Sequence, residues 1–338
     1  MKNLFNYTKK DLENYFVSIG EKSFKATQVT EWVYRKRVFD VDGFLNMNKV
    51  LREKISNDFV FDFITVKKVE EDSEVAKFLF ALKDGECIEA VLMKHSYGLS
   101  VCVSSQVGCN MGCAFCESGR LKKVRNLEVF EMVQQILLIE KHIEKKINSI
   151  VIMGIGEPFD NYDNILKFLE ICNEPKGLEI GARHISVSTC GLVPKILEFK
   201  DFPLQINLAV SLHAPNDELR SSLMPVNKVY NLNMLIDALK TYLETTNRRV
   251  TIEYVLLKNV NDSMKNAHEL ARLLKGINVY VNLIYYNQTS SDFVSSDEEV
   301  ARKFCEVLKL NNIDVTIRRK FGNKITAACG QLRSKEVE

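Results

Sequence analysis

Apolar residues in the first part of the chain recur at the three- and four-residue spacing of helices that bury one face. Two runs follow this spacing: Leu12, Phe16 and Ile19, and then Ala26, Val29, Trp32 and Val33. Gly20 separates the two runs and is a typical helix stop. The pattern predicts that residues 1–58 form a small N-terminal helical accessory domain.

The next segment shows the alternating and β-branched pattern of strands. Four stretches carry it: 61–66, 76–82, 87–93 and 99–104. Asp84-Gly85, between the second and third stretches, is a strong signal for a hairpin turn. We expect residues 59–98 to form a short antiparallel β linker that leads into the next domain.

From residue 126 onward, strand-like and helix-like stretches alternate, beginning with a helix that Asn126 can cap. The predicted strands are 149–153, 184–189, 206–212, 250–257, 279–285 and 315–318, and the later predicted helices are 161–172, 192–199, 232–246, 263–274 and 295–310. Repeated strand-then-helix units imply a parallel sheet with right-handed crossovers. We therefore expect an α/β fold in which residues 99–333 form a partial (β/α) barrel of six or seven strands, followed by a polar tail at 334–338.

Composition narrows the class of protein. The 338 residues, 46% of them hydrophobic, can fill the core of one large domain plus an appended piece. The net charge of +2 argues neither for nor against a nucleic-acid partner. No stretch of 18 apolar residues is present, and the first ten residues lack the apolar region of a signal peptide. The nine cysteines are therefore expected to be free or metal-bound in a reducing cytoplasm.

The most informative stretch is Cys109-Asn-Met-Gly-Cys113-Ala-Phe-Cys116, in which three thiols lie within eight residues. A structural zinc site needs four ligands, and four cysteines on a four-iron cluster leave no iron open. Three cysteines leave one iron of a [4Fe–4S] cluster free to bind and reduce a small molecule such as S-adenosylmethionine (SAM). Gly108 and Gly112 permit the tight loop, and Phe115 can shield the cluster. The alternatives are a zinc site completed by a distant Cys or His, and three unrelated buried thiols.

In parallel barrels, sites lie at the carboxyl ends of the strands, and the residues at these ends are unusual in this chain. Gly156 lets the backbone approach a ligand closely, and the carboxylate of Glu157 can accept from an ammonium group such as that of SAM. The other candidates for cofactor binding are Ser188, Ser211, Leu212, His213 and Asn287. Considered singly, the G-x-G is also compatible with an ordinary turn, and His213 with a structural role.

Two further cysteines and one basic run have both structural and functional interpretations. Cys329 lies among small residues on a predicted loop, and Cys102 lies on a predicted strand. Either thiol is compatible with simple burial as a small apolar side chain. The run Arg35-Lys36-Arg37 is either a solvated helix end or a contact with RNA phosphates.

With these motifs, the sequence resembles the radical SAM RNA methyltransferases of the RlmN/Cfr family over essentially its whole length. The matching motifs are Cys102-Val-Ser-Ser-Gln-Val-Gly-Cys109 with Cys113 and Cys116, Met153-Gly-Ile-Gly-Glu-Pro158, Ser211-Leu-His-Ala-Pro-Asn-Asp217, Val250-Thr-Ile-Glu-Tyr-Val255 and Ala327-Ala-Cys-Gly-Gln-Leu332. The segment 28–38 also resembles the accessory domain that engages RNA in this family. The resemblance implies a partial radical-SAM barrel, a [4Fe–4S] cluster, and an electron donor such as flavodoxin or ferredoxin.

The resemblance also implies a mechanism that uses two SAM molecules per turnover. One methylates Cys329, and the other yields a 5′-deoxyadenosyl radical that takes a hydrogen atom from this methyl group. The resulting methylene radical adds to a ring carbon of an adenine in RNA. Glu89 matches the family's proton acceptor. Cys102 then attacks Cys329, which forms a disulfide and releases the methylated base.

Pro158 and the run His213–Asp217 resemble the branch that methylates adenine C2, in 23S rRNA and possibly in tRNA. Three departures from the family pattern bear on this assignment: Glu117-Ser118-Gly119 after the cysteines, Gln288 after Asn287, and Thr326 before Ala327. The alternatives are C8 methylation of 23S rRNA, which gives antibiotic resistance, a radical enzyme with a non-RNA substrate, and a non-catalytic RNA-binding paralogue. The presence of Cys102, Cys329 and Glu89 argues against the paralogue.

Overall fold

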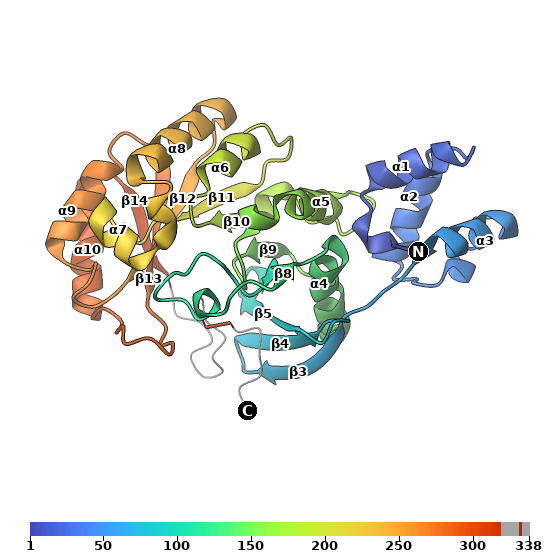
Figure 1. Cartoon of the computed structure of the whole chain (residues 1–338), viewed down its shortest axis with the longest axis horizontal. Coiled ribbons are helices and arrows are strands. Elements are labelled where there is room, and N and C mark those ends of the chain that lie inside the picture. The colour runs from blue at the N-terminus through green and yellow to red at the C-terminus, as the bar shows by residue number, and fades with distance from the viewer. Residues whose placement is uncertain (319–330, 333–338) are drawn as a thin grey trace.

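The computed structural model describes residues 1–318 and 331–332. Its N-terminal part is helical, as the apolar spacing predicts (Figure 1). The elements are β1 (Lys2–Asn3), η1 (Leu4–Asn6), α1 (Lys9–Ser18), α2 (Lys25–Thr30), η2 (Glu31–Arg35), η3 (Val41–Gly43), α3 (Lys49–Asp58) and β2 (Phe59–Val60). Thr8 caps α1, because its side chain accepts from the N–H of Asp11 while the Asp11 carboxylate accepts from the N–H of Thr8. Leu12 and Phe16 form the buried face of α1.

One ten-stranded sheet organises the rest of the described chain. Its strands in spatial order are β14 (Asp314–Arg318), β13 (Val279–Tyr285), β12 (Val250–Leu256), β11 (Asn207–Ser211), β10 (Ile185–Thr189), β9 (Ser149–Ile152), β6 (Gly98–Cys102), β5 (Cys87–His95), β4 (Val75–Ala81) and β3 (Thr65–Glu71). The seven strands from β14 to β6 are parallel, which confirms the predicted partial barrel. Strands β6, β5, β4 and β3 pair antiparallel, so the strands expected as a linker continue the same sheet.

Helices connect the parallel strands and cover the outer face of the sheet (Figure 1). They are α4 (Val129–Ile143), α5 (Tyr162–Asn173), α6 (Val193–Phe199), α8 (Leu232–Thr246), α9 (Met264–Leu273) and α10 (Glu298–Leu310). Helix α7 (Asp217–Leu223) lies in the loop after β11, where the carbonyl of Leu223 accepts from the N–H of Ala114 in the cysteine loop. Short elements in the loops are β7 (Gln106–Val107), β8 (Arg125–Asn126), η4 (Ser118–Arg120), η5 (Pro158–Asn161), η6 (Ala182–His184) and η7 (Pro225–Lys228). Helix α8 shows why the helices pack on the sheet: Leu235, Leu239 and Tyr242 form a buried apolar face, while Lys240 is exposed.

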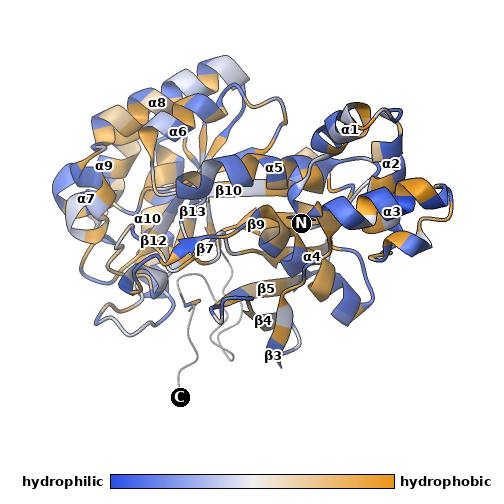
Figure 2. Cartoon of the chain, turned by 45° about the vertical axis from the view of Figure 1, so that its right-hand side comes forward, coloured by the Kyte–Doolittle hydropathy of each residue, from blue (hydrophilic) through white to orange (hydrophobic). Residues whose placement is uncertain are grey.

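The colouring in Figure 2 shows the same division, with mainly hydrophobic residues on β4, β5 and β9 and mixed stripes on helices such as α3. None of the helices within the described ranges combines the length and the apolar character needed to cross a membrane.

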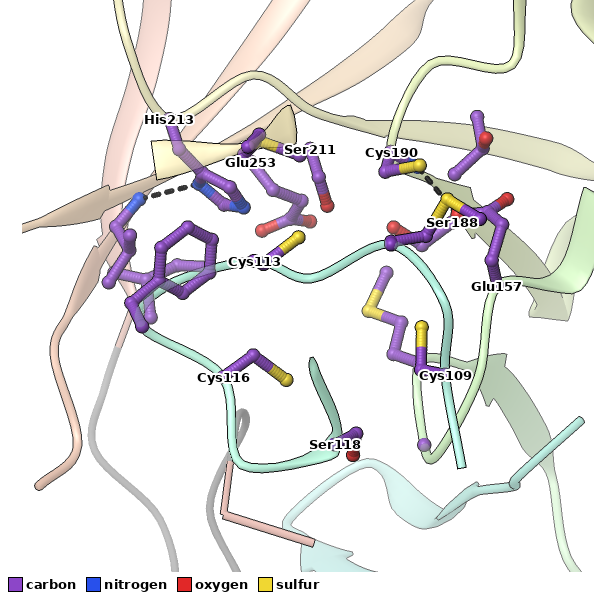
Figure 3. A pocket seen from close by; sticks show the side chains of 18 of the residues that line it. Cys109, Cys113, Cys116, Ser118, Glu157, Ser188, Cys190, Ser211, His213 and Glu253 are labelled. Atoms are coloured by element: carbon purple, nitrogen blue, oxygen red, sulfur yellow. Dashed lines mark hydrogen bonds between the residues drawn. The ribbon is translucent and has the colours of Figure 1, made fainter. Parts of the chain in front are cut away.

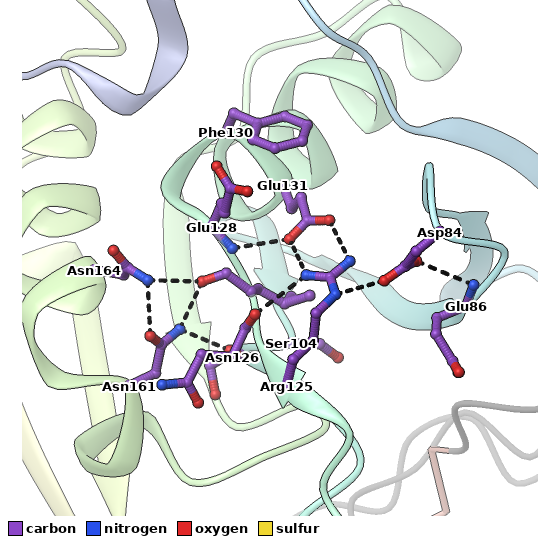
Figure 4. Close-up of polar contacts among 12 residues, drawn as sticks. Asp84, Glu86, Ser104, Arg125, Asn126, Glu128, Phe130, Glu131, Asn161 and Asn164 are labelled. Carbon is purple, nitrogen blue, oxygen red and sulfur yellow. Dashed lines mark hydrogen bonds and ion pairs between the residues drawn. The ribbon is translucent and has the colours of Figure 1, made fainter. Parts of the chain in front are cut away.

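A polar network fixes the segment that follows the cysteine loop (Figure 4). Arg125 of β8 donates to both carboxylate oxygens of Glu131, at 2.7 and 2.8 Å, and to Asp84 in the turn between β4 and β5 at 2.6 Å. Hydrogen bonds to Glu131 and Asp84 raise the pKa of the Arg125 guanidinium, and Arg125 lowers the pKa of Asp84. The network joins the hairpin turn, β8 and the start of α4.

Candidate functional site

A cavity of about 1000 Å³, including its mouth, lies at the carboxyl ends of the parallel strands (Figure 3). Most of the candidates from the sequence line it: Cys109, Cys113, Phe115, Cys116, Gly156, Glu157, Ser188, Ser211, His213 and Asn287. These residues come from the loop after β7 and from the ends of β9, β10, β11 and β13. The rule that sites lie at the carboxyl ends of strands therefore located this cavity.

Backbone hydrogen bonds and two glycines set the path of the cysteine loop. The N–H of Cys109 donates to the carbonyl of Leu121 at 3.1 Å, and the N–H of Ala114 donates to the carbonyl of Leu223 at 2.9 Å. Gly108 and Gly112 have φ values of 72° and 65°, a region that other residues rarely adopt. A Cβ atom on Gly108 would also lie 2.3 Å from the carbonyl oxygen of Lys122.

The thiols of Cys109, Cys113 and Cys116 surround one space instead of converging on a point (Figure 3). Within residues 1–318 and 331–332, no three His, Cys, Asp or Glu side chains are grouped as in a site for a single metal ion. Burial raises the pKa of Cys109 to about 12 and raises the pKa values of Cys113 and Cys116. Such thiols keep their protons at neutral pH until a positively charged metal centre displaces them.

Glu157 is a buried carboxylate that lines the cavity. One of its oxygens accepts from the N–H of Phe159 at 3.0 Å, and the other accepts from the N–H of Cys190 at 2.8 Å. Burial raises the pKa of Glu157, and these N–H groups act in the opposite direction. Its own N–H donates to Gln106 at 2.8 Å, which fixes the loop after β9. This rigidly held carboxylate can accept a charge-assisted hydrogen bond from a cationic ligand group.

His213 lines the same cavity in a left-handed backbone conformation, with φ of 56°. Its Nδ1 accepts from the N–H of Val255 at 3.0 Å, so the neutral ring carries its proton on Nε2. The ring packs edge-on against Phe115, with 4.8 Å between the centroids. Burial, assisted by the charge of Arg220, lowers the pKa of His213 to about 3. The neutral ring can donate one hydrogen bond to a ligand but carries no charge at neutral pH.

Leu212 differs from the other candidates because its side chain does not line the cavity. It is fully buried in the main hydrophobic core, and its N–H donates to the carbonyl of Glu253 at 3.0 Å. Ser211, the last residue of β11, lines the cavity, and Leu212 directly after it packs its side chain in the core. Only its backbone is placed near the site.

Glu89 and Cys102 lie on the neighbouring surface of the sheet, outside the lining of the cavity. Cys102 on β6 pairs in register with Val91 on β5, two residues from Glu89. Alternation therefore puts Glu89, Val91 and Cys102 on one face. Cys102 packs there with Val91 and with Met153 at the edge of the cavity. Both side chains are buried.

Cys329 lies outside the described residues, but two residues that follow it are anchored at the site. The carbonyl of Leu332 accepts from the hydroxyl of Ser118 at 3.0 Å, and Leu332 packs in one cluster with Cys102. The side-chain amide of Gln331 donates to the carbonyl of Gln288 at 2.7 Å. Ser118, in the stretch after the cysteines, and Gln288 thus hold Leu332 and Gln331 in place.

The basic run of the accessory domain makes contacts within the protein. Arg35 pairs with Glu179 at 3.0 Å, Arg37 pairs with Glu140, and the Lys36 ammonium lies 3.5 Å from the centroid of the Trp32 ring. Both arginines therefore connect the accessory domain to the barrel. A contact between this run and RNA stays a prediction.

Comparison with known proteins identifies the family. Residues 103–271 match the sequence model of the radical SAM superfamily, and residues 2–60 match that of the ribosomal RNA large subunit methyltransferase N-terminal domain. The probable dual-specificity RNA methyltransferase RlmN of Spiroplasma citri is 48% identical over 99% of this chain and 98% of its own length. The chain belongs to the RlmN family of radical SAM methyltransferases.

Further similarities extend over the same full length. The probable RlmN of Acholeplasma laidlawii is 49% identical over 99% of each chain. The crystal structure of a radical SAM methyltransferase from Sphaerobacter thermophilus has a TM-score of 0.92 and 41% identity, covering 99% of this chain and 100% of that chain. These comparisons confirm the family and the fold that the motifs indicate.

RlmN-family enzymes use a [4Fe–4S] cluster and SAM, and the cavity fits both groups. Three thiols, that of Cys109 buried and those of Cys113 and Cys116 partly exposed, face one space large enough for more than a single ion. Two acidic side chains, Glu157 and Glu253, line the same space, and Oε2 of Glu253 is buried with no hydrogen-bond partner among the described residues. Unpaired buried oxygens are rare in proteins without a ligand or water to satisfy them.

Two residues of this RlmN-family site were missed by sequence reasoning. Glu253 interrupts the apolar strand β12, and an acid in a buried strand was the available signal. Arg220 has a fully buried guanidinium that donates to the carbonyls of Cys190 and Ser211 and to Asn227 at 2.7, 3.2 and 2.9 Å. It ties the ends of β10 and β11 together beneath the cavity, and its place in a short polar helix gave no sequence signal.

Proposed function

We propose that this RlmN-family enzyme methylates C2 of an adenosine in 23S rRNA, and an adenosine in tRNA as a second substrate. The observation that carries the proposal is one cavity lined by three thiols and a buried carboxylate, next to a sheet surface that presents Glu89 and Cys102. We place the activity in the cytoplasm, where RNA substrates of this kind are made.

Sequence similarity supports an RNA substrate. The curated relatives are named dual-specificity RNA methyltransferases, and they match this chain over nearly its full length. The accessory domain matches a family named for ribosomal RNA. An adenine inside a duplex must leave its stack to reach a buried site, so the proposed reaction includes extrusion of the target base.

Cys109, Cys113 and Cys116 would hold the cluster, and the loop of Gly156 and Glu157 would bind the amino group of SAM. Ser188, Ser211 and His213 would supply hydroxyl and imidazole groups to the ribose and carboxylate, and Asn287 would supply its amide to the adenine or ribose. Leu212 would contribute only its backbone. The cluster supplies one-electron reduction when it is bound, with a small flavodoxin or ferredoxin as the proposed electron donor. Glu157 is suited to binding the amino group of SAM because two backbone N–H groups fix the orientation of its carboxylate.

Three residues would act on the RNA. Cys329 would carry the methyl group to the adenine, Glu89 would accept the proton from the ring carbon, and Cys102 would release the base by forming a disulfide with Cys329. The anchoring of Gln331 and Leu332 beside the cysteine loop supports this role for Cys329. The shared face of Glu89 and Cys102 supports their pairing in the reaction.

The test is nucleoside analysis by mass spectrometry after anaerobic incubation with unmodified rRNA and tRNA, SAM and a reductant. We expect 2-methyladenosine from the native enzyme and none from Cys329→Ala, which should keep its iron and sulfide content. Cys102→Ala should accumulate a covalent enzyme–RNA adduct. The appearance of 8-methyladenosine would replace the C2 assignment by C8, and the absence of any methylated adenosine would overturn the function.

A further inference from the structure

Glu89, the expected proton acceptor, is held by a lysine from the neighbouring strand. One of its oxygens lies 3.3 Å from the ammonium nitrogen of Lys77 on β4. The Lys77 ammonium also lies 3.1 Å from Glu70 on β3, and Glu70 lies 2.7 Å from Lys68. Side-chain exposure is 10% for Glu89 and 12% for Lys77, but 60% for Lys68, so the chain of charges runs from the interior to the surface.

Strand register puts this pair on the same face as Cys102. Lys77 pairs with Val91, and Val91 pairs with Cys102 on the other side. The opposite face of these strands is apolar and packs in the main core through Phe78, Ile88 and Ala90. The titratable side chains that alternation brings to the Glu89 face of β3 to β6 are Lys68, Glu70, Lys77, Cys87, Glu89, His95 and Cys102.

Burial of a carboxylate without a partner is costly, and in an apolar setting the group keeps its proton. A protonated Glu89 could not accept another proton. An ammonium group at ion-pair distance favours the charged form, which is the form a base needs. Hydrogen bonds to Lys68 and then to Lys77 lower the pKa of Glu70, so its carboxylate places a negative charge beside the Lys77 ammonium.

We propose that Lys77 is a positioning residue that keeps Glu89 ionised and oriented toward the adenine during methyl transfer. This inference rests on the proposed function. In the step concerned, the ring carbon that has accepted the methylene group still carries its hydrogen. That hydrogen leaves as a proton to the Glu89 carboxylate, and the electron pair of the broken C–H bond stays in the adenine ring. The unpaired electron left by the radical addition would be accepted by the [4Fe–4S] cluster, which is oxidised once it has reduced SAM. Lys77 does not touch the RNA and takes no part in cluster or SAM binding.

The test compares Lys77→Met with Lys94→Met in the anaerobically reconstituted full-length enzyme. Lys94 is a matched control because it makes a similar cross-strand pair with Glu71, at 2.5 Å, on the same sheet. We expect Lys77→Met to lower the rate of 2-methyladenosine formation about 100-fold, within the range of a lost general base. The yield of 5′-deoxyadenosine should stay within about twofold, and the covalent enzyme–RNA adduct should accumulate, because only the later proton transfer is slowed.

The pH profile separates this role from simple structural support. Residual activity of Lys77→Met should reach its maximum about one pH unit higher than in the native enzyme, since more alkaline conditions are needed to ionise Glu89. Lys77→Arg keeps the charge and should recover at least about a tenth of the activity with the native pH profile. If Lys77→Met does not fold, the activities and pH profiles of Lys77→Arg and Lys94→Arg are compared instead.

Several results would overturn the proposal. One is native activity and a native pH profile in Lys77→Met. Another is a raised KM with unchanged kcat in Lys77→Met, which would make Lys77 an RNA contact. The third is a Lys77→Arg variant that is as inactive as Lys77→Met. The variant Glu89→Gln distinguishes a failure of the inference on Lys77 from a failure of the proposed role of Glu89. If Glu89→Gln is inactive and Lys77→Met is normal, only the inference on Lys77 fails. If Glu89→Gln is fully active, the proposed role of Glu89 fails as well.

Discussion

The hydroxyl of Ser118 donates a 3.0 Å hydrogen bond to the backbone carbonyl of Leu332. Ser118 follows the last cysteine of the loop by two residues, and Leu332 follows Cys329 by three. The bond therefore joins the segment that is expected to hold the cluster to the segment that carries the expected methyl carrier. Both groups are buried, so the bond is shielded from competing water.

Loss of this bond should affect methyl transfer more than cofactor binding. Ser118→Ala removes the donor and leaves a buried carbonyl unpaired, which costs about 1–3 kcal/mol locally. We expect RNA methylation to fall about tenfold, while iron content and SAM affinity change less than about twofold. Ser222→Ala, which removes a similar bond to the carbonyl of Leu219 on the exposed side of α7, is the control. Equal activities of the two variants would show that the Ser118 bond has no role in catalysis.

Gly108 is predicted to be required for assembly of the cysteine loop. Gly108→Ala combines an unfavourable φ with a clash against the carbonyl of Lys122. Gly85→Ala is a matched control, because Gly85 has φ of 87° but no atom within 4 Å of the added Cβ. Gly85→Ala should lower the free energy of unfolding by about 1–2 kcal/mol and keep full iron loading. Gly108→Ala should lose most of its iron on reconstitution; normal loading would contradict the account of the loop.

Arg125 is predicted to support the fold through the buried carboxylate of Glu131. Glu131 is 3% exposed, so Arg125→Met leaves a buried charge without its partner, at a cost of about 3 kcal/mol in the free energy of unfolding. Arg302→Met breaks an exposed pair with Glu306 on α10 and should cost less than about 1 kcal/mol. Urea unfolding of the apoprotein measures both. A similar small cost for the two variants would show that the Arg125 network is not structural.

His213 predicts a specific pH dependence of stability. Its pKa is about 3 in the folded protein, against about 6.5 in an unfolded chain, so only the unfolded state binds this proton between these values. The free energy of unfolding therefore falls as the pH decreases below 6.5. For the native apoprotein, His213 contributes about 1.4 kcal/mol to the loss between pH 7.5 and 5.5. His213→Asn, which tolerates the left-handed backbone, should lose less stability by this amount over the same interval. An unchanged pH dependence would exclude a neutral buried histidine.

Strong periodicity made most of the barrel predictable from the sequence. The predicted helix at 232–246 and strand at 279–285 match α8 and β13 in both bounds, because Asn231 caps the helix and β-branched residues fill the strand. The start of α4 differs from the prediction, in which Asn126 caps the helix. In the structure Glu128 is the cap and forms a capping box with Glu131, while Asn126 pairs in β8. Because Glu128 and Glu131 both lie near the start of the helix, the capping pattern in the sequence fits a cap at Asn126 as well as a cap at Glu128.

The candidate site was predictable where a motif marked a strand end, and less so where tertiary contacts decide. The thiols, Glu157 and His213 line one cavity as expected. The pairing of Lys77 with Glu89 was not visible because it depends on the register of the β4–β5 hairpin, and Arg220 carries no local signal because it contacts strand ends that are distant in sequence. The union of β3–β5 with the barrel was also not visible, since pairing between β5 and β6 depends on register and not on composition.

The central claim is that three thiols of one loop hold a cluster that cleaves SAM reductively. The most direct measurement is the yield of 5′-deoxyadenosine from the anaerobically reconstituted protein with SAM, dithionite and RNA, compared with the triple variant Cys109→Ala, Cys113→Ala, Cys116→Ala. The account predicts 5′-deoxyadenosine from the native chain and none from the triple variant. Equal yields from the two proteins, or no product from a native protein that holds iron and sulfide, would contradict it.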